Sequence, residues 1–249
     1  MGLSRNGSSR PALGRRPWPA LGAVVLALVL ATSCGESKFR YVSNSAINTY
    51  LKVPAGWEEY KQDDLVQAEL DAARQANKPS SLIDVLINRQ FQWRMAFDGD
   101  PAPSVEHTLS LAEEPVVEVS VRALDQDEHD QVSLAALRNV IVNYDEMKAE
   151  AQSGLGGSGV GVAGESTKTF RPIDEEELHF DDGVRGIRLR YVLRPNASSP
   201  FYAFDQTTLV DSKAQRLYVL LIRSGEAQFL RYNQLFTEIA KSFTVKPKG

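Results

Sequence analysis

Hydrophobic and polar residues alternate along several stretches of the chain, which predicts β-strands with one buried face. The stretches 39–42 and 47–53 flank a Ser-Asn-Ser turn, and Pro54 to Trp57 stops the second of them. The stretch 217–222 is apolar without a break, which indicates a strand buried on both faces. By the same criteria, further strands are predicted at 92–97, 116–124, 187–193 and 201–210.

Apolar residues that recur every three or four positions predict helices elsewhere. Asp63 and Asp64 open one at 65–75. Ser133 is a good N-cap for a second, which would place one apolar stripe on Leu134, Leu137, Ile141 and Tyr144. The last helix, about 226–243, carries a continuous stripe of Phe229, Tyr232, Phe236, Ile239 and Phe243. The stretch 82–89 fits a helix or a strand, because it follows a Ser-Ser cap but is rich in β-branched residues.

A glycine-rich segment interrupts this pattern at 152–166, with six glycines and no aromatic residue. Such a composition is typical of a flexible loop or linker. It could divide two domains. We favour a loop inside a single domain at 39–246, because neither half has enough predicted strands to close a sheet alone.

The N-terminal segment has the pattern of an export signal. The first 20 residues carry four arginines and no acidic residue, and 21–30 is almost wholly apolar but too short to span a membrane. The one cysteine of the chain, Cys34, follows the small residues Ala31-Thr32-Ser33. This arrangement resembles a bacterial lipobox, although Ala31 stands where leucine is usual. The sequence therefore predicts a signal peptide at 1–33, an acylated Cys34 and a short tether at 34–38.

Two other interpretations of Cys34 remain: a plainly secreted protein with a free thiol, and an uncleaved anchor. We favour acylation, because a lone cysteine cannot form an internal disulfide and this one directly follows the apolar run. Acylation would hold the chain on the outer face of the cytoplasmic membrane. Stable anchoring requires more than one acyl chain, which the diacylglyceryl group of bacterial lipoproteins provides.

Charge limits the partners of the exported protein. The chain has 28 Lys and Arg against 32 Asp and Glu, and loss of residues 1–33 removes four of the arginines. The remaining 216 residues then have 24 basic and 32 acidic side chains, a net charge of −8. This balance is unfavourable for nucleic acid binding and argues against attachment to anionic lipid through charge.

Short motifs in both halves resemble the PsbP/Mog1-like family. KVPAGWEEY at 52–60 is similar to the strand that runs into a Pro-x-Gly-Trp turn in that family. FYAFDQTTLVDSKAQRLYVLLI at 201–222, followed by EIAKSF at 238–243, is similar to its hairpin and final helix. Actinobacterial lipoproteins of the LpqN type share this plan behind a lipobox. The resemblance covers roughly 39–246. It implies an α+β fold, an antiparallel sheet flanked by helices on both faces, in a family of non-catalytic binding and accessory proteins.

Basic and aromatic residues supply the candidate binding sites. Arg188, Arg190 and Arg194 would line one face of a strand, where they could receive an anionic group or pair with acidic side chains of a neighbouring strand. Trp57 could line a pocket, although a core position is favoured. We expect no metal site. The acidic segment 125–130 lacks EF-hand spacing and is interpreted as a solvated loop, and the acidic run 174–182 is interpreted as solvated surface.

Catalytic motifs are absent from the sequence. It contains three histidines, without zinc-site spacing, and no Gly-x-Ser-x-Gly elbow. The favoured hypothesis is a membrane-anchored binding or accessory module for a cell-envelope protein, with no cofactor. A carrier of a lipid or an anionic small ligand, held between sheet and helix, is the alternative. A hydrolase ranks third, because a catalytic triad can assemble from distant residues.

Overall fold

The computed structural model describes residues 38–76, 90–153, 170–180 and 182–246. The strands and helices given below belong to one compact unit that begins at Phe39. Three predictions lie outside the described residues: the signal peptide with Cys34, the element at 82–89, and the glycine-rich loop beyond 153. In the described part of the chain, no helix is long and apolar enough to cross a membrane.

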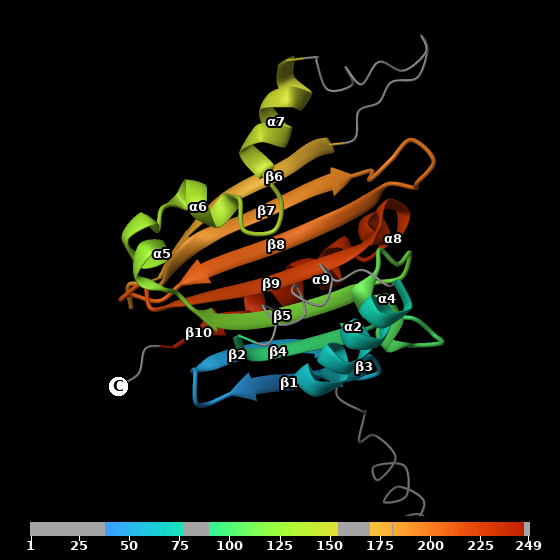
Figure 1. Ribbon diagram of the computed structural model, residues 1–249, viewed down its shortest axis with the longest axis horizontal. Helices are drawn as coiled ribbons and strands as arrows, with labels where there is room; N and C mark the ends of the chain where they lie inside the picture. The colour runs from blue at the N-terminus through green and yellow to red at the C-terminus, as the bar shows by residue number, and fades with distance from the viewer. Residues whose placement is uncertain (1–37, 77–89, 154–169, 181, 247–249) are drawn as a thin grey trace, which may run out of the picture. The chain divides into compact units, whose positions relative to one another are not determined.

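A large antiparallel sheet forms the centre of this unit (Figure 1). Among the described residues it has seven strands, in the order β3-β4-β5-β9-β8-β7-β6. Their bounds are β3 Glu58–Lys61, β4 Phe91–Asp98, β5 Val116–Ala123, β6 Phe170–His179, β7 Arg185–Leu193, β8 Tyr202–Val210 and β9 Arg216–Gly225. Strand β9 lies inside the sheet and is buried along most of its length, as its unbroken apolar run predicts.

A second, small sheet has the order β1-β2-β10, with β1 at Phe39–Asn44, β2 at Thr49–Pro54 and β10 at Thr244–Val245. β1 and β2 form the hairpin that the sequence predicts, and the turn includes Asn48 in a left-handed conformation with φ of 52°. β10 joins the C-terminal end of the chain to β2, with Val245 opposite Thr49. The two ends of the domain are therefore held in one sheet.

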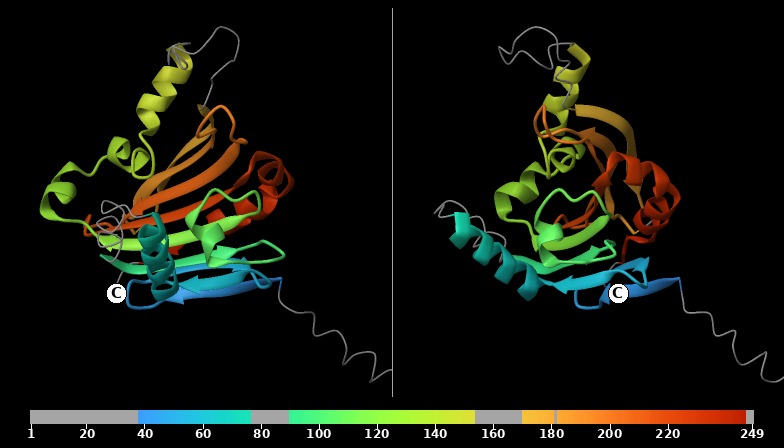
Figure 2. Two further views of the ribbon diagram at one scale, coloured as in Figure 1. Left: turned by 45° about the vertical axis from the view of Figure 1, so that its right-hand side comes forward. Right: turned by 90° about the vertical axis from the view of Figure 1, so that its right-hand side faces the viewer.

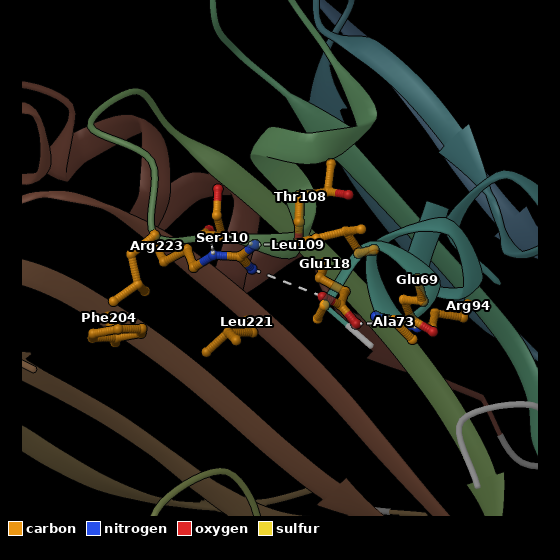
Figure 3. Close-up of a pocket in the computed structure, with 13 residues that line it drawn as sticks. Glu69, Ala73, Arg94, Thr108, Leu109, Ser110, Glu118, Phe204, Leu221 and Arg223 are labelled. Atoms are coloured by element: carbon orange, nitrogen blue, oxygen red, sulfur yellow. Dashed lines mark hydrogen bonds and ion pairs between the residues drawn. The ribbon is translucent and has the colours of Figure 1, made fainter. Parts of the chain in front are cut away.

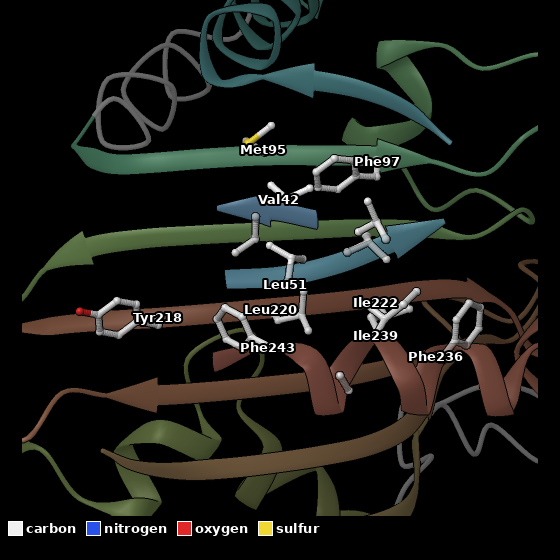
Figure 4. Close-up of a cluster of buried hydrophobic side chains, with 14 of the residues drawn as sticks. Val42, Leu51, Met95, Phe97, Tyr218, Leu220, Ile222, Phe236, Ile239 and Phe243 are labelled. Atoms are coloured by element: carbon white, nitrogen blue, oxygen red, sulfur yellow. The ribbon is translucent and has the colours of Figure 1, made fainter. Parts of the chain in front are cut away.

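One face of the large sheet is covered by the small sheet together with α8 (Glu226–Arg231) and α9 (Asn233–Ser242); we call it the closed face. Its core is apolar, and the side chains of α9 and β9 meet those of β2 and β4 (Figure 4). Fully or almost fully buried members include Leu51, Phe97, Leu220, Ile222, Phe236 and Ile239. The inward-facing side chains of the alternating strands and the apolar stripe of the last helix thus pack together in one core.

The opposite face carries the other described helices, and we call it the groove face. Their bounds are α2 Gln62–Ala76, α4 Val105–Leu109, α5 Gln126–Gln131, α6 Leu134–Arg138 and α7 Tyr144–Ser153. α6 and α7 cover β6 and β7 over a second apolar cluster, whereas α2 and α4 pack near β4 (Figure 2). Helices therefore flank an antiparallel sheet on both faces, and the predicted α+β class is confirmed.

Several local predictions were wrong. The acidic segment at 125–130 is the short helix α5, because Asp125 and Glu128 form a reciprocal capping box. The helix predicted beyond Ser133 breaks after Arg138, which leaves Ile141 exposed. The last helix is divided at Tyr232, whose ψ of 12° interrupts regular helix geometry. Besides α5, the elements β3, α4, α7, β6 and β10 were not predicted.

Candidate functional site

A groove of about 680 Å³ opens on the groove face, above the middle of the large sheet (Figure 3). Its floor comes from β4, β5, β8 and β9, with Phe204 and Leu221 as the apolar part. One wall is helix α2 and the other is the segment 108–111 at the end of α4. Among the described residues, the groove lies between the helices that cover the two ends of this face.

Local sequence explains the shape of the α2 wall. Asp63 and Asp64 lie in its first turn, where acidic side chains favour the helix dipole, and Leu65 anchors it by complete burial. Its last turns present small side chains to the groove, Ala72, Ala73 and Ala76. Small side chains leave space between the helix and the sheet, so the groove remains open.

Arg94 is the centre of an ionic cluster on the floor. Its Nη1 lies 2.5 Å from Oε1 of Glu69 on α2, and its Nε lies 2.7 Å from Oε1 of Glu118 on β5. Burial lowers the pKa of Arg94, but the two carboxylates raise it by more, so the net shift is upward. The guanidinium is therefore held charged and in a fixed orientation between the helix and the sheet.

Arg223 lies on the other side of Glu118, on β9, and is only 7% exposed. Its Nη2 donates to the carbonyl oxygen of Thr108, and its Nε lies 3.3 Å from the carbonyl oxygen of Ser110. The nearest carboxylate contact is Oε2 of Glu118, 3.8 Å from Nη1. Burial lowers the pKa of Arg223, and the attraction of the Glu118 carboxylate opposes this shift without reversing it.

A histidine and a buried aspartate meet at the end of α4. Nδ1 of His107 lies 2.9 Å from Oδ2 of Asp98, which is 1% exposed. The same carboxylate accepts hydrogen bonds from the backbone N–H groups of Asp100 and Ser104, so it organises the loop between β4 and α4. Among the described residues, no serine hydroxyl is hydrogen-bonded to His107. The pair supports the loop geometry and does not extend to a Ser-His-Asp triad.

The predicted arginine stripe is on the closed face, remote from the groove. Nε and Nη2 of Arg188 lie 2.8 Å and 2.5 Å from the two carboxylate oxygens of Asp205, and both residues are buried. Arg190 pairs with Asp174 of the neighbouring strand at 2.7 Å. Arg194 follows the end of β7, with its guanidinium over the ring of Phe201. Two of the three arginines are therefore engaged by carboxylates of the same sheet.

The other predicted sites have structural surroundings. Trp57 is partly buried, packs against the core of the closed face and meets Gly99 closely. The acidic run at 174–177 lies in the edge strand β6, where Glu175 pairs with Arg138 and Lys148. Within the described ranges, no group of three or more His, Cys, Asp or Glu side chains is gathered closely enough to hold a metal ion.

The four charged residues of the groove were not singled out from the sequence. Glu118 is one of the polar residues that alternate with valines in the strand predicted at 116–124. Arg94 lies inside the strand predicted at 92–97, and Arg223 directly follows the apolar strand 217–222. A charged residue inside a predicted buried strand is the one available signal, because such residues are rarely buried without a partner. Their meeting across α2, β4, β5 and β9 depends on the sheet order.

Comparisons with known proteins give likenesses of fold. No family model and no curated protein matches the chain. Cyanobacterial PsbP from Synechocystis sp. PCC 6803 matches with a TM-score of 0.44 and 14% identity over 86% of this chain and 96% of that chain. The Ran-binding protein Mog1p of Saccharomyces cerevisiae matches with a TM-score of 0.41 and 11% identity, over 84% and 96% of the two chains.

A protein of unknown function from Pseudomonas aeruginosa, described as a putative regulator, has a TM-score of 0.38 and 10% identity. The match covers 85% of this chain and 100% of that chain. All three TM-scores lie below 0.5, so these likenesses carry no argument about activity or partners. The α+β architecture rests on the strand order and helix positions of this chain itself.

Proposed function

We propose that the chain is a lipoprotein on the outer face of the cytoplasmic membrane, anchored through Cys34, and a non-catalytic binding module for a cell-envelope protein. The export signal and the small residues before Cys34 support the anchor. The segments 52–60 and 201–243 support the finer assignment to PsbP/Mog1-like lipoproteins of the LpqN type.

The groove is the observation that carries the binding role. Much of its lining is apolar, from Phe204, Leu221 and the alanines of α2, and the charges on its floor are fixed by one another. A preorganised concave surface with a few oriented polar groups is typical of a binding site. Its charged groups are engaged in structural ion pairs, which favours recognition over proton transfer.

Filling the groove tests this role. Ala72 is exposed on α2 and lines the groove, so Ala72→Trp should occupy the space with little effect on folding. We expect it to abolish the co-purification of an envelope protein with the anchored chain. Asp127→Trp, at an exposed position on α5, is the matched control and should leave co-purification unchanged. Equal recovery of the partner with both variants would exclude the groove as its binding site.

The anchor has a separate test. Cys34 precedes the first strand of the domain, so Cys34→Ala should leave the free energy of unfolding unchanged and release the protein from the membrane fraction. Fractionation of membranes after salt and carbonate washing measures this release. A Cys34→Ala protein that stays in the washed membranes would contradict lipid anchoring.

Arg223 favours a second candidate function, the carriage of an anionic small ligand with an apolar part. Its guanidinium is held by backbone carbonyl groups, and its charge is met by one carboxylate oxygen at 3.8 Å, which a ligand anion could supplement. Native mass spectrometry of the purified protein would detect such a ligand. Loss of the bound mass in Arg223→Gln, with the fold retained, would support the carrier; no bound mass in the wild type would exclude it.

A further inference from the structure

We propose that the outer surface of the small sheet and α9 rests on the phospholipid headgroups of the membrane. This surface, called the basic surface below, is defined by Phe39, Tyr41, Tyr50, Lys52, Lys241 and Lys246. The inference rests on the proposed acylation of Cys34. It adds an orientation to the anchor, because it states which side of the domain meets the bilayer.

The alternation of β1 and β2 separates the two sides of the small sheet. Val42, Leu51 and Val53 point into the core of the closed face, where each is buried. Their neighbours point outward, and Tyr41 is 85% exposed opposite Lys52. The ring of Tyr41 is therefore presented on the outer side of the small sheet, beside Lys52.

Aromatic rings and lysines are combined on this surface. Nζ of Lys52 lies 4.5 Å from the ring centre of Phe39, and Nζ of Lys246 lies 5.1 Å from that of Tyr50. Aromatic rings with a polar end collect at membrane–water interfaces, and lysines beside them can reach phosphate oxygens while their methylene groups cover apolar surface. Lys52 also contacts Glu238 at 3.6 Å, whereas Lys241 and Lys246 are exposed.

Charge is strongly segregated between this layer and the rest of the domain. The segments 38–57 and 226–249, which supply the small sheet, α8 and α9, contain seven Lys and Arg and two Asp and Glu. The remainder of the chain after residue 33 contains 17 basic and 30 acidic residues. The net charge of −8 therefore hides a basic layer, which is complementary to anionic lipid headgroups.

The length of the tether keeps this surface near the anchor. Phe39, the first residue of β1, is five residues after Cys34. Five residues reach at most about 18 Å when fully extended. An acylated Cys34 at the bilayer surface would thus hold the start of β1 within that distance of the headgroups. The tether thus gives the basic surface a high effective concentration at the bilayer, so that a weak attraction from a few lysines and aromatic rings is enough to hold it there.

The orientation has a consequence for the groove. The small sheet and α9 lie on the closed face of the large sheet, and α2 lies on the opposite side (Figure 2). The groove lies beside α2, on that opposite face. A domain that rests on its basic surface directs the groove away from the bilayer. A membrane-anchored chain in this orientation would leave the groove accessible to a partner in the envelope.

A fluorescent label can measure this orientation in the anchored full chain. Acylation blocks the thiol of Cys34, so Tyr41→Cys supplies the single reactive thiol, and Asp127→Cys on α5 supplies the matched control. Both proteins are reconstituted in vesicles of phosphatidylethanolamine and phosphatidylglycerol that contain a headgroup-linked nitroxide quencher. We expect quenching at position 41 to exceed that at position 127 at least threefold, with a blue-shifted emission at position 41.

The outcomes separate the two proposals. Equal, weak quenching at the two positions of an acylated protein overturns the orientation and leaves the anchor in place. A wild-type chain whose Cys34 reacts with the label, and which stays in the soluble fraction, removes the anchor and the orientation with it.

A charge variant tests the role of the lysines. Lys241→Glu combined with Lys246→Glu should reduce quenching at position 41 toward the value at position 127. Lys61→Glu on β3 is the control with one reversed charge at an exposed position outside the basic surface, and it should leave quenching unchanged. Retained quenching in the double variant, with its fold verified by circular dichroism, would contradict the contribution of charge.

Discussion

The two faces of the large sheet are built from the same strands but differ in the polarity of the side chains at their centres. On the closed face, Phe236 and Ile239 of α9 meet Leu220 and Ile222 of β9 in a continuous apolar layer. On the groove face, the middle of the sheet carries Arg94, Glu118 and Arg223, which line the groove between the described helices. Both faces bury an apolar cluster, but the middle of the groove face also holds a cluster of charged side chains.

Buried arginines on the two faces differ in how completely carboxylates compensate their charge. Arg188 and Asp205, on the closed face, form a two-point pair in which the guanidinium meets both carboxylate oxygens. Arg223, on the groove face, has its closest contacts with neutral carbonyl groups. A closed pair has little capacity for a further ligand. An arginine with incomplete charge compensation beside a groove retains that capacity, which supports the binding role proposed for the groove face.

The largest predicted effect would come from the core of the closed face. Phe236 is fully buried, so Phe236→Ala should lower the free energy of unfolding by about 4 kcal/mol, through lost burial and the cavity left behind. Leu230, 71% exposed on α8, is the control, and Leu230→Ala should change it by less than about 0.5 kcal/mol. Equal losses in denaturant titrations of the two variants would contradict the assignment of the core.

The ionic cluster of the groove face should give the next effect. Arg94→Met removes the guanidinium contacts of the partly buried Glu69 and Glu118 carboxylates, at a cost of about 3 kcal/mol. Arg94→Met combined with Glu69→Gln removes this ion pair and leaves Glu118 beside Arg223, so it should recover part of that loss. Thermal and urea unfolding of both variants measures the difference. A double variant less stable than the single one would contradict this account of the loss.

The capping box of α5 should give the smallest effect. Asp125→Ala removes the side-chain acceptor for the N–H of Glu128 and should cost about 1 kcal/mol. The Arg122 hydrogen bond lowers the pKa of Glu128, so its contribution is present above the unfolded pKa and is lost as the pH falls through the folded pKa. Glu128→Gln should thus destabilise the protein at pH 7 and have no effect in strong acid. A pH-independent effect in urea titrations would rule out the charged contact.

The sequence predicts those elements in which the order of buried and exposed side chains is visible as a regular pattern of apolar and polar residues. The β1–β2 hairpin, the alternating strand β5 and the apolar strand β9 follow from period-2 and continuous apolar patterns. Helix α5 was not predicted because its capping residues lie within an acidic run that resembles a solvated loop. Strand β6 was not predicted because it is an edge strand with few buried positions and four consecutive acidic residues.

The groove could not be predicted, because it depends on contacts between distant elements. Arg94 and Glu69 are 25 positions apart, and the contact from Arg223 to Thr108 spans 115 positions. These pairs form only once β9 lies beside β5 and α2 packs against β4. The arginines with the most visible pattern, Arg188 and Arg190, are engaged by Asp205 and Asp174, because pairing within a sheet satisfies a regular stripe.

The most direct test of the groove as the binding site is crosslinking inside the cell. A photoreactive amino acid is placed at Ala72 in the groove and, in a second strain, at Asp127 on α5, and mass spectrometry identifies the products. We expect one discrete envelope protein crosslinked from position 72, with a lower yield in Arg94 and Arg223 variants, and none from position 127. The same set of products from both positions, or none from position 72, would contradict it.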